Sequence, residues 1–257
     1  MKSSNPMLKS FENKQRESLN DARSLAISNT DALERSMTIS GTVNKAAILT
    51  GIVVLVAMFM WDMCSKGFSD KATLLLSIGA ISGLILAIIT SFKPHIARIT
   101  APVYAICEGY VIGVVSYAYG MAFDGIVQNA LMITILTLFV MLGLYKTKII
   151  QATPTFRKVV VTSTLAIAIF YIVGIIAAFL GHPMTVFNGG LMGIGITLLF
   201  CGIAALNLIL DFDFIEKGAQ NNFPSYFEWY GGFTLLVTLV WLYLEMLRLL
   251  AQLQSRD

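Results

Sequence analysis

The chain has 257 residues, of which 56% are hydrophobic and only 13% are charged, and its mean hydropathy is +0.75. Ordinary soluble domains contain about 25% charged residues, so this composition excludes a typical soluble domain and indicates a polytopic membrane protein. The net charge of +3 is small, and it gives no reason to expect a nucleic-acid partner.

Residues 1–45 form a polar segment of mixed charge with seven Lys or Arg. The segment lacks the apolar content to fold alone, so we expect a flexible or surface-associated cytoplasmic tail, with an amphipathic helix on anionic lipid as the alternative. No apolar run lies near the start, so we expect no cleavable signal peptide. Residues 46–257 are predicted to form the transmembrane domain.

Seven apolar runs follow, each close to the roughly 20 residues with which a helix crosses the apolar core of a bilayer. They lie near residues 46–64, 72–92, 102–120, 124–145, 159–180, 188–211 and 230–251. The sequence therefore predicts an all-α fold, a polytopic bundle of seven transmembrane helices.

The Lys and Arg residues indicate how these spans are oriented. With the tail in the cytoplasm, fourteen Lys and Arg fall on the cytoplasmic side and four on the other. Because cytoplasmic loops are rich in these residues, we expect a multi-pass protein of the inner (cytoplasmic) membrane with a cytoplasmic N-terminus. The C-terminus then lies outside, whereas a re-entrant last segment would return it to the cytoplasm.

Glu108 lies within the third run, in PVYAICEGYVIG (102–113). It is about 9 Å along the helix from Pro102, which is too deep for a short acid to reach the membrane surface with ease. Two interpretations remain open. Glu108 is either a protonated or hydrogen-bonded residue that packs between helices, or part of a site that faces a cavity.

Two acids, Asp211 and Asp213, close the sixth run on the predicted cytoplasmic side. Asp213 and Lys217 are four residues apart, so they can pair at a solvated helix end. Asp211 shares a helix face with Asn207, which lies inside the apolar run, so we expect that face to point into the bundle. The sequence favours Asp211 as the buried acid, with two ordinary acids at a helix end as the alternative.

The last run contains Glu245, and Arg248 is close enough in sequence to pair with it, which would make an interfacial ion pair. Glu245 lies in the outer half of the membrane if the helix begins at Trp229, and nearer the middle if the glycine pair 231–232 breaks or delays it. Glu228, beside Trp229, is typical of a membrane interface and would add negative potential to the inner mouth.

The sequence offers little for catalysis. The two histidines, His95 and His182, fall on opposite sides of the membrane in this topology, so they cannot share a metal ion. The hydrolase motif GxSxG, the zinc motif HExxH and the nucleotide-binding glycine motifs do not occur. We therefore expect no enzyme, no catalytic residue, no resident cofactor and no certain metal site.

Four segments of the chain carry a family resemblance. They are MTISGTVNK (37–45), PVYAICEGYVIG (102–113), AALNLILDFDFIEKG (204–218) and EWYGGFTLLVTLVWLYLEMLRLL (228–250). These segments resemble the prokaryotic branch of the Bax inhibitor-1 family from about residue 37 to the end, and the last two are the most specific. The resemblance implies two three-helix layers around a central C-terminal helix, and a pH-sensitive calcium leak across the membrane.

The resemblance also implies that two acids, one late in span six and one in span seven, lie near each other and share a proton. Asp211, or less well Asp213, matches the first position. Glu245 matches the second, where the better-known branch has aspartate. Two adjacent carboxylates do not both ionise cheaply, and loss of the shared proton would leave mutual repulsion and an oxygen cluster for a cation. A modest pH change could then shift a two-state helix arrangement.

Three functions follow from these observations. The buried acids and the resemblance favour a pH-gated calcium leak channel. The alternative is a regulatory membrane protein without transport of its own, which would use its tail to bind a membrane protease or another membrane protein. An intramembrane hydrolase is disfavoured by the scarcity of histidines and of nucleophiles with a nearby base.

Overall fold

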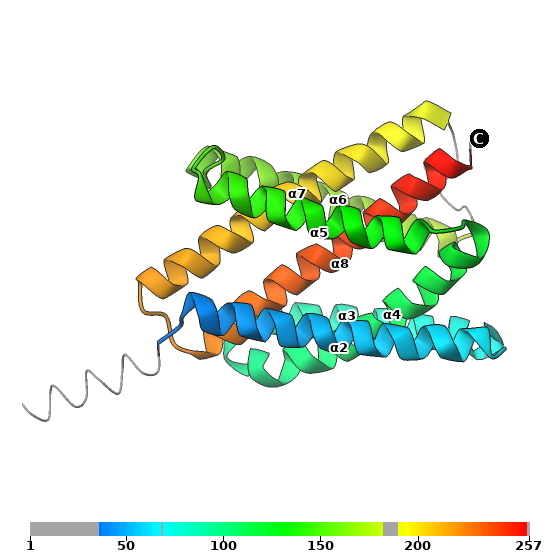
Figure 1. Cartoon of the computed structure of the whole chain (residues 1–257), viewed down its shortest axis with the longest axis horizontal. Coiled ribbons are helices and arrows are strands. Elements are labelled where there is room, and N and C mark those ends of the chain that lie inside the picture. Colours follow the sequence, from blue (N-terminus) through cyan, green and yellow to red (C-terminus); the bar gives the residue numbers. More distant parts are fainter. Residues whose placement is uncertain (1–35, 68, 182–189, 256–257) are drawn as a thin grey trace, which may run out of the picture.

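The computed structural model describes residues 36–67, 69–181 and 190–255 (Figure 1). These residues form seven α-helices and one short 3-10 helix, with no strand among them. The helices are α2 (Ile39–Ser65), α3 (Ser69–Phe92), α4 (Ala97–Ala122), α5 (Ile126–Lys146), α6 (Pro154–Phe179), α7 (Gly190–Gln220) and α8 (Tyr226–Gln254), with the 3-10 helix η1 (Pro94–Ile96).

Six of the described helices are long and apolar enough to cross a membrane, and α3 adds a shorter apolar stretch over Leu76–Phe92. The chain is therefore a multi-pass membrane protein with its helices in a lipid bilayer. The predicted all-α transmembrane bundle is confirmed.

Two helices extend well beyond the apolar runs that predicted them. α2 begins at Ile39, because the Thr38 hydroxyl accepts a hydrogen bond from the Gly41 N–H over 2.9 Å and caps the first turn. α7 continues to Gln220, so Asp211 lies inside a helix and not at its end. Apolar runs show where a helix is in lipid, whereas the capping groups decide where it begins and ends.

The last helix, α8, is the hub of the described bundle. It contacts α2, α4, α5, α7 and η1, while α3 packs on α4 and α6 packs on α7. Figure 1 shows α8 crossing the molecule between α2 and α5. A central C-terminal helix was expected, and the arrangement of the other helices in two layers of three stays a prediction.

α8 is one continuous helix from Tyr226 to Gln254, so the glycine pair does not break it, and the side of the membrane on which the C-terminus lies stays a prediction. The glycines serve close packing instead. A Cβ atom on Gly232 would lie 2.9 Å from the backbone nitrogen of Ala46, and one on Gly231 would lie 2.9 Å from Thr42 Cγ2. α2 can therefore approach the backbone of α8, as small residues permit between membrane helices.

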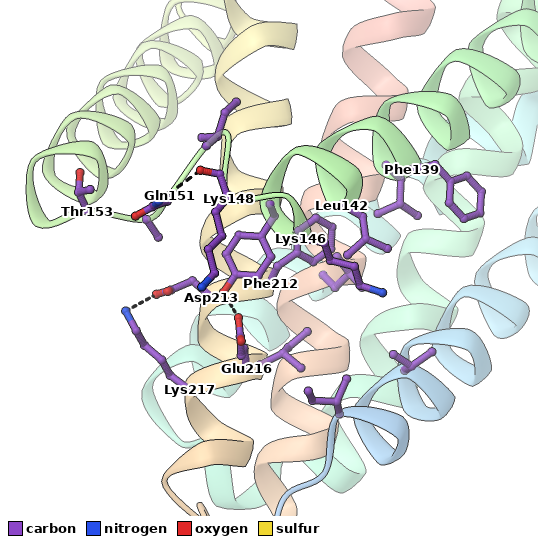
Figure 2. A pocket seen from close by; sticks show the side chains of 18 residues that line it. Phe139, Leu142, Lys146, Lys148, Gln151, Thr153, Phe212, Asp213, Glu216 and Lys217 are labelled. Atoms are coloured by element: carbon purple, nitrogen blue, oxygen red, sulfur yellow. Dashed lines mark hydrogen bonds and ion pairs between the residues drawn. The ribbon is translucent and has the colours of Figure 1, made fainter.

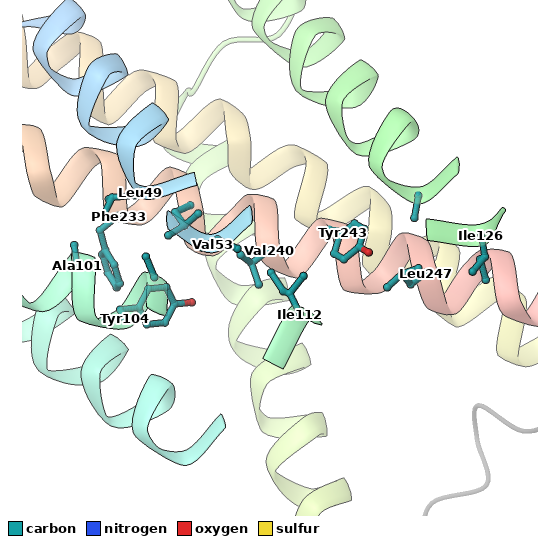
Figure 3. Close-up of a cluster of buried hydrophobic side chains, with 13 residues drawn as sticks. Leu49, Val53, Ala101, Tyr104, Ile112, Ile126, Phe233, Val240, Tyr243 and Leu247 are labelled. Atoms are coloured by element: carbon teal, nitrogen blue, oxygen red, sulfur yellow. The ribbon is translucent and has the colours of Figure 1, made fainter. Parts of the chain in front are cut away.

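A set of buried apolar side chains joins α8 to α2, α4 and α5 (Figure 3). Phe233 of α8 packs edge-on against Tyr104 of α4, with ring centroids 5.1 Å apart. Lipid chains are as apolar as these side chains, so dispersion contacts between well-fitted surfaces, more than exclusion from water, stabilise this packing. α8 is thereby fixed against α2, α4 and α5.

Candidate functional site

The acidic side chains of α7 and α8 form separate groups, and each group has its own partners. Asp211, Asp213 and Glu216 lie along α7, and Glu228 and Glu245 lie near opposite ends of α8. The partners of each carboxylate decide what it can do.

Asp211 is half-buried between α7 and α8. Its Oδ2 accepts a hydrogen bond of 2.6 Å from the Thr238 hydroxyl of α8. Within the part of the chain that the structure describes, no Lys, Arg or His nitrogen lies within 4.0 Å of this carboxylate. An ionised Asp211 would therefore have a hydroxyl partner and no compensating charge, a costly setting inside an apolar helix.

One turn earlier on α7, Asn207 donates hydrogen bonds to Thr164 Oγ1 of α6 (2.8 Å) and to the carbonyl of Ile203 (2.9 Å). The prediction that the face of Asn207 and Asp211 points into the bundle is confirmed. This face places polar groups against two of the helices that α7 contacts, namely α6 and α8.

Asp213 has two cationic partners. Its Oδ2 lies 2.9 Å from Lys217 Nζ and 2.6 Å from a guanidinium nitrogen of Arg157 on α6 (Figure 2 draws the Lys217 pair). The predicted pair with Lys217 is confirmed. Asp211 as the buried acid stays a prediction, because it is half-buried by exposed surface and has no cationic partner among the described residues; Asp213 is itself only 6% exposed, which the sequence did not predict. The cause is α6, whose first turn covers Asp213 with Arg157.

Glu245 is 1% exposed and fully partnered. Its carboxylate pairs with Arg248 at 3.1 Å, as predicted, and accepts hydrogen bonds from Trp241 Nε1 (3.1 Å) and from the Tyr171 hydroxyl of α6. Arg248 in turn donates to the Tyr171 oxygen. The group ties α6 to α8 and neutralises Glu245. Sequence reasoning missed Tyr171, because a tyrosine in an apolar run carries no signal of its partner.

The structure does not bring Asp211 and Glu245 together. Asp211 contacts Thr238, and Glu245 lies seven residues further along α8, which is about 10 Å along the helix axis. The shared proton that the family resemblance implied is therefore wrong for this arrangement. The two acids differ in kind, since Glu245 has a cation partner and Asp211 has a hydroxyl.

Glu228 is buried at the start of α8, where it binds the start of α2. Its Oε1 accepts hydrogen bonds from the backbone N–H (3.0 Å) and the hydroxyl (2.7 Å) of Thr38, and its Oε2 lies 3.2 Å from Lys45 Nζ. A Cβ atom on Gly41 would lie 2.0 Å from the Glu228 oxygen. Lys45 therefore offsets the charge of Glu228 and Thr38 covers its carboxylate, so the negative potential expected from Glu228 at the inner mouth stays a prediction.

Glu108 lies at the interface of α4 with α3. Its Oε1 is 3.2 Å from the position that a Cβ atom on Gly83 would occupy. This favours the packing interpretation of Glu108 over a site shared with the acids of α7 and α8. Across the described residues, no group of three or more His, Cys, Asp or Glu side chains could hold a metal ion.

Comparison with known proteins gives one match. A family model described as "Bax inhibitor 1 like" matches residues 5–255, which is nearly the whole chain. No curated protein and no solved structure matches.

Proposed function

This chain belongs to the Bax inhibitor 1 like family, and from that membership and the setting of Asp211 we propose that it is a pH-sensitive cation leak channel whose transported ion is calcium. In this proposal it belongs to the prokaryotic branch of the family and lies in the inner membrane with its N-terminus in the cytoplasm. It is not an enzyme and needs no resident cofactor.

The observation that carries the proposal is the partnering of Asp211. Ionisable groups within membrane helices are rare and mark ion pathways or proton relays. Asp213, Glu228 and Glu245 each lie within 3.2 Å of a Lys or Arg nitrogen, which neutralises them. Asp211 accepts from Thr238 and has no cation within 4.0 Å among the described residues. Of these four acids, Asp211 is therefore the one whose charge is available to a passing cation.

In this mechanism one acid, and not a pair, responds to pH. Protonated Asp211 presents no charge to the α7–α8 contact, whereas ionised Asp211 presents a carboxylate beside the Thr238 hydroxyl. Calcium takes about six to eight oxygen ligands, more than these two side chains supply. Water or backbone carbonyls would complete its shell, which suits a site of passage better than a site of storage.

The group of Glu245, Arg248 and Tyr171 has a structural part in this proposal. It connects α6 to α8 about 10 Å away from the Asp211 contact. This group keeps the two helices together while the α7–α8 contact at Asp211 responds to protonation.

The test is calcium flux into dye-loaded proteoliposomes, scanned over about pH 5.5 to 8, a range that brackets the usual titration of perturbed carboxylates. Wild type is compared with Asp211→Asn and with Asp124→Asn, which neutralises an exposed acid in the loop between α4 and α5. We expect Asp211→Asn to flatten the pH dependence and Asp124→Asn to retain it. An unchanged profile in Asp211→Asn would contradict the proposal.

Absence of flux at every pH from folded wild-type protein would favour the alternative, a regulator that binds a membrane protease or another membrane protein. That alternative is tested by deleting residues 1–35 and measuring capture of the partner. The deletion should stop there, because Met37 and Thr38 hold α2 to the α7–α8 connection.

A further inference from the structure

A hollow of about 700 Å³ opens beside α5, at the end of the bundle where α2 begins and α5 and α7 end (Figure 2). Its volume is within the range of small-molecule and lipid-chain sites. The walls are mainly aliphatic and aromatic side chains from four helices. They include Val43 of α2, Leu138, Phe139 and Leu142 of α5, Phe212 of α7 and Leu235 of α8.

The hollow opens to the outside of the bundle. Val43 is 54% exposed and Phe139 is 62% exposed, although both line it. Side chains of this kind on a membrane helix face lipid chains. An acyl chain can therefore enter from the side, between α2 and α5, without any movement of the helices.

The rim of the hollow is basic. Lys146, Lys148 and Lys217 line it together with Asp213 and Glu216. Both acids already have partners: Asp213 pairs with Lys217 and with Arg157, and Glu216 accepts from the Tyr145 hydroxyl and from Gln220.

Lys146 and Lys148 differ from Lys217 in having no carboxylate partner in the part of the chain that the structure describes. Among the described residues, no carboxylate oxygen lies within 4.0 Å of either ammonium group. Figure 2 shows their side chains diverging from the end of α5 on the two sides of the hollow. The rim thus offers two lysine charges against the one carboxylate, Glu216, whose partners are neutral, so its net charge is positive.

Lys148 has an unusual backbone conformation. α5 ends with hydrogen bonds from the N–H of Ile149 to the carbonyl of Leu144 (3.1 Å) and from the N–H of Lys148 to the carbonyl of Tyr145 (3.0 Å). This ending requires a left-handed residue after the helix, normally Gly or Asn. Lys148 occupies that place with φ of 58°, at a cost in backbone strain.

α7 ends in the same way, and there the left-handed residue is Asn222, with φ of 52°. The chain thus uses the favoured residue type at one helix end and a lysine at the other. The residue in this left-handed place lines the rim of the hollow and is basic, where Gly or Asn is the usual choice.

We propose that this hollow binds one anionic phospholipid, with an acyl chain between α2 and α5 and the headgroup at the rim that carries Lys146 and Lys148. The basic residues of the chain predict that this end lies at the cytoplasmic surface, where anionic headgroups attract basic residues. The proposal does not depend on ion conduction.

Native mass spectrometry of the full chain in neutral detergent tests the proposal, with phosphatidylglycerol, phosphatidylcholine and inorganic phosphate as probes. We expect one phosphatidylglycerol to bind in preference to phosphatidylcholine, with no competition from phosphate. Each lysine near an anionic lipid surface contributes about fivefold in affinity, so the double variant Lys146→Gln/Lys148→Gln should lose roughly 25-fold.

Two variants separate binding from folding. Lys148→Gly removes the charge and also the strain, so it should weaken phosphatidylglycerol binding about fivefold while the melting temperature stays level or rises. The matched control is Lys66→Gln/Lys93→Gln, which neutralises two exposed lysines outside the hollow and should bind as wild type does.

Three results would overturn the proposal. The first is phosphatidylglycerol binding that the double variant leaves unchanged. The second is equal competition by inorganic phosphate, which would indicate an anion site without an acyl chain. The third is phosphatidylglycerol binding that begins only after residues 1–35 are deleted, which would make that acid-containing segment the occupant.

Discussion

The contact between Gly41 and Glu228 permits a quantitative test of how the first and last helices are joined. An alanine at position 41 would place its Cβ atom 2.0 Å from Glu228 Oε1 and 2.3 Å from the carboxyl carbon, so the carboxylate must move. It would then lose its hydrogen bonds from the N–H and hydroxyl of Thr38. We therefore expect Gly41→Ala to lower stability.

The size of this loss of stability follows from the hydrogen bonds and the helix propensity that the substitution changes. Hydrogen bonds to a charged acceptor contribute about 1.5 kcal/mol or more each, so the loss of two costs about 3 kcal/mol. Alanine has a higher helix propensity than glycine by about 1 kcal/mol, which offsets part of the loss. The net destabilisation is about 2 kcal/mol, or a fall in melting temperature of about 4–8 °C for a chain of this size.

The assay is thermal unfolding in detergent, beside a control on the same helix. Gly51 also lies within α2, but a Cβ atom there meets nothing within 4 Å, so Gly51→Ala should be neutral or slightly stabilising. With Glu228→Ala already present, Gly41→Ala should keep only its gain in helix propensity, which gives a coupling of about 3 kcal/mol in a double-mutant cycle. Equal melting temperatures for Gly41→Ala and Gly51→Ala would refute the reasoning.

Three further substitutions test the other groups by thermal unfolding. Glu245→Gln should cost about 3 kcal/mol, because it leaves Arg248 without its buried partner, and stability equal to wild type would contradict this. Tyr171→Phe removes a hydroxyl that both residues contact and should cost about 1–2 kcal/mol; a smaller effect would show that the ion pair suffices. Asp213→Asn should cost only about 1 kcal/mol, because its two basic partners are half exposed and can be solvated, and a loss as large as that of Glu245→Gln would contradict this.

The sequence predicted those features of the structure that depend on local sequence alone. Hydropathy located the helices, and helical spacing alone predicted the pairs of Asp213 with Lys217 and of Glu245 with Arg248. These pairs require only that a helix forms. The inward face of Asn207 was predicted on the same basis.

The contacts between distant segments were not predictable in this way. Arg157 joins Asp213, Tyr171 joins Glu245 and Thr38 joins Glu228, each across more than 50 residues. Such contacts depend on how the helices pack, and no local pattern specifies their register. For this reason the sequence did not predict the burial of Asp213, the partners of Glu228 or the separation of Asp211 from Glu245.

The hydrogen bonds between Thr38 and Glu228 also have a consequence for folding during synthesis. These two residues are separated by 190 positions, so the start of α2 leaves the ribosome long before its partner exists. At about 5–20 residues per second, that interval lasts roughly 10–40 s. During this time Thr38 and Lys45 have no carboxylate to bind, and the nascent bundle stays open on the side that α8 later fills. Completion of the last helix is therefore the step that closes the fold, and a chain cut short before Glu228 would present that open side to the quality-control proteases of the membrane.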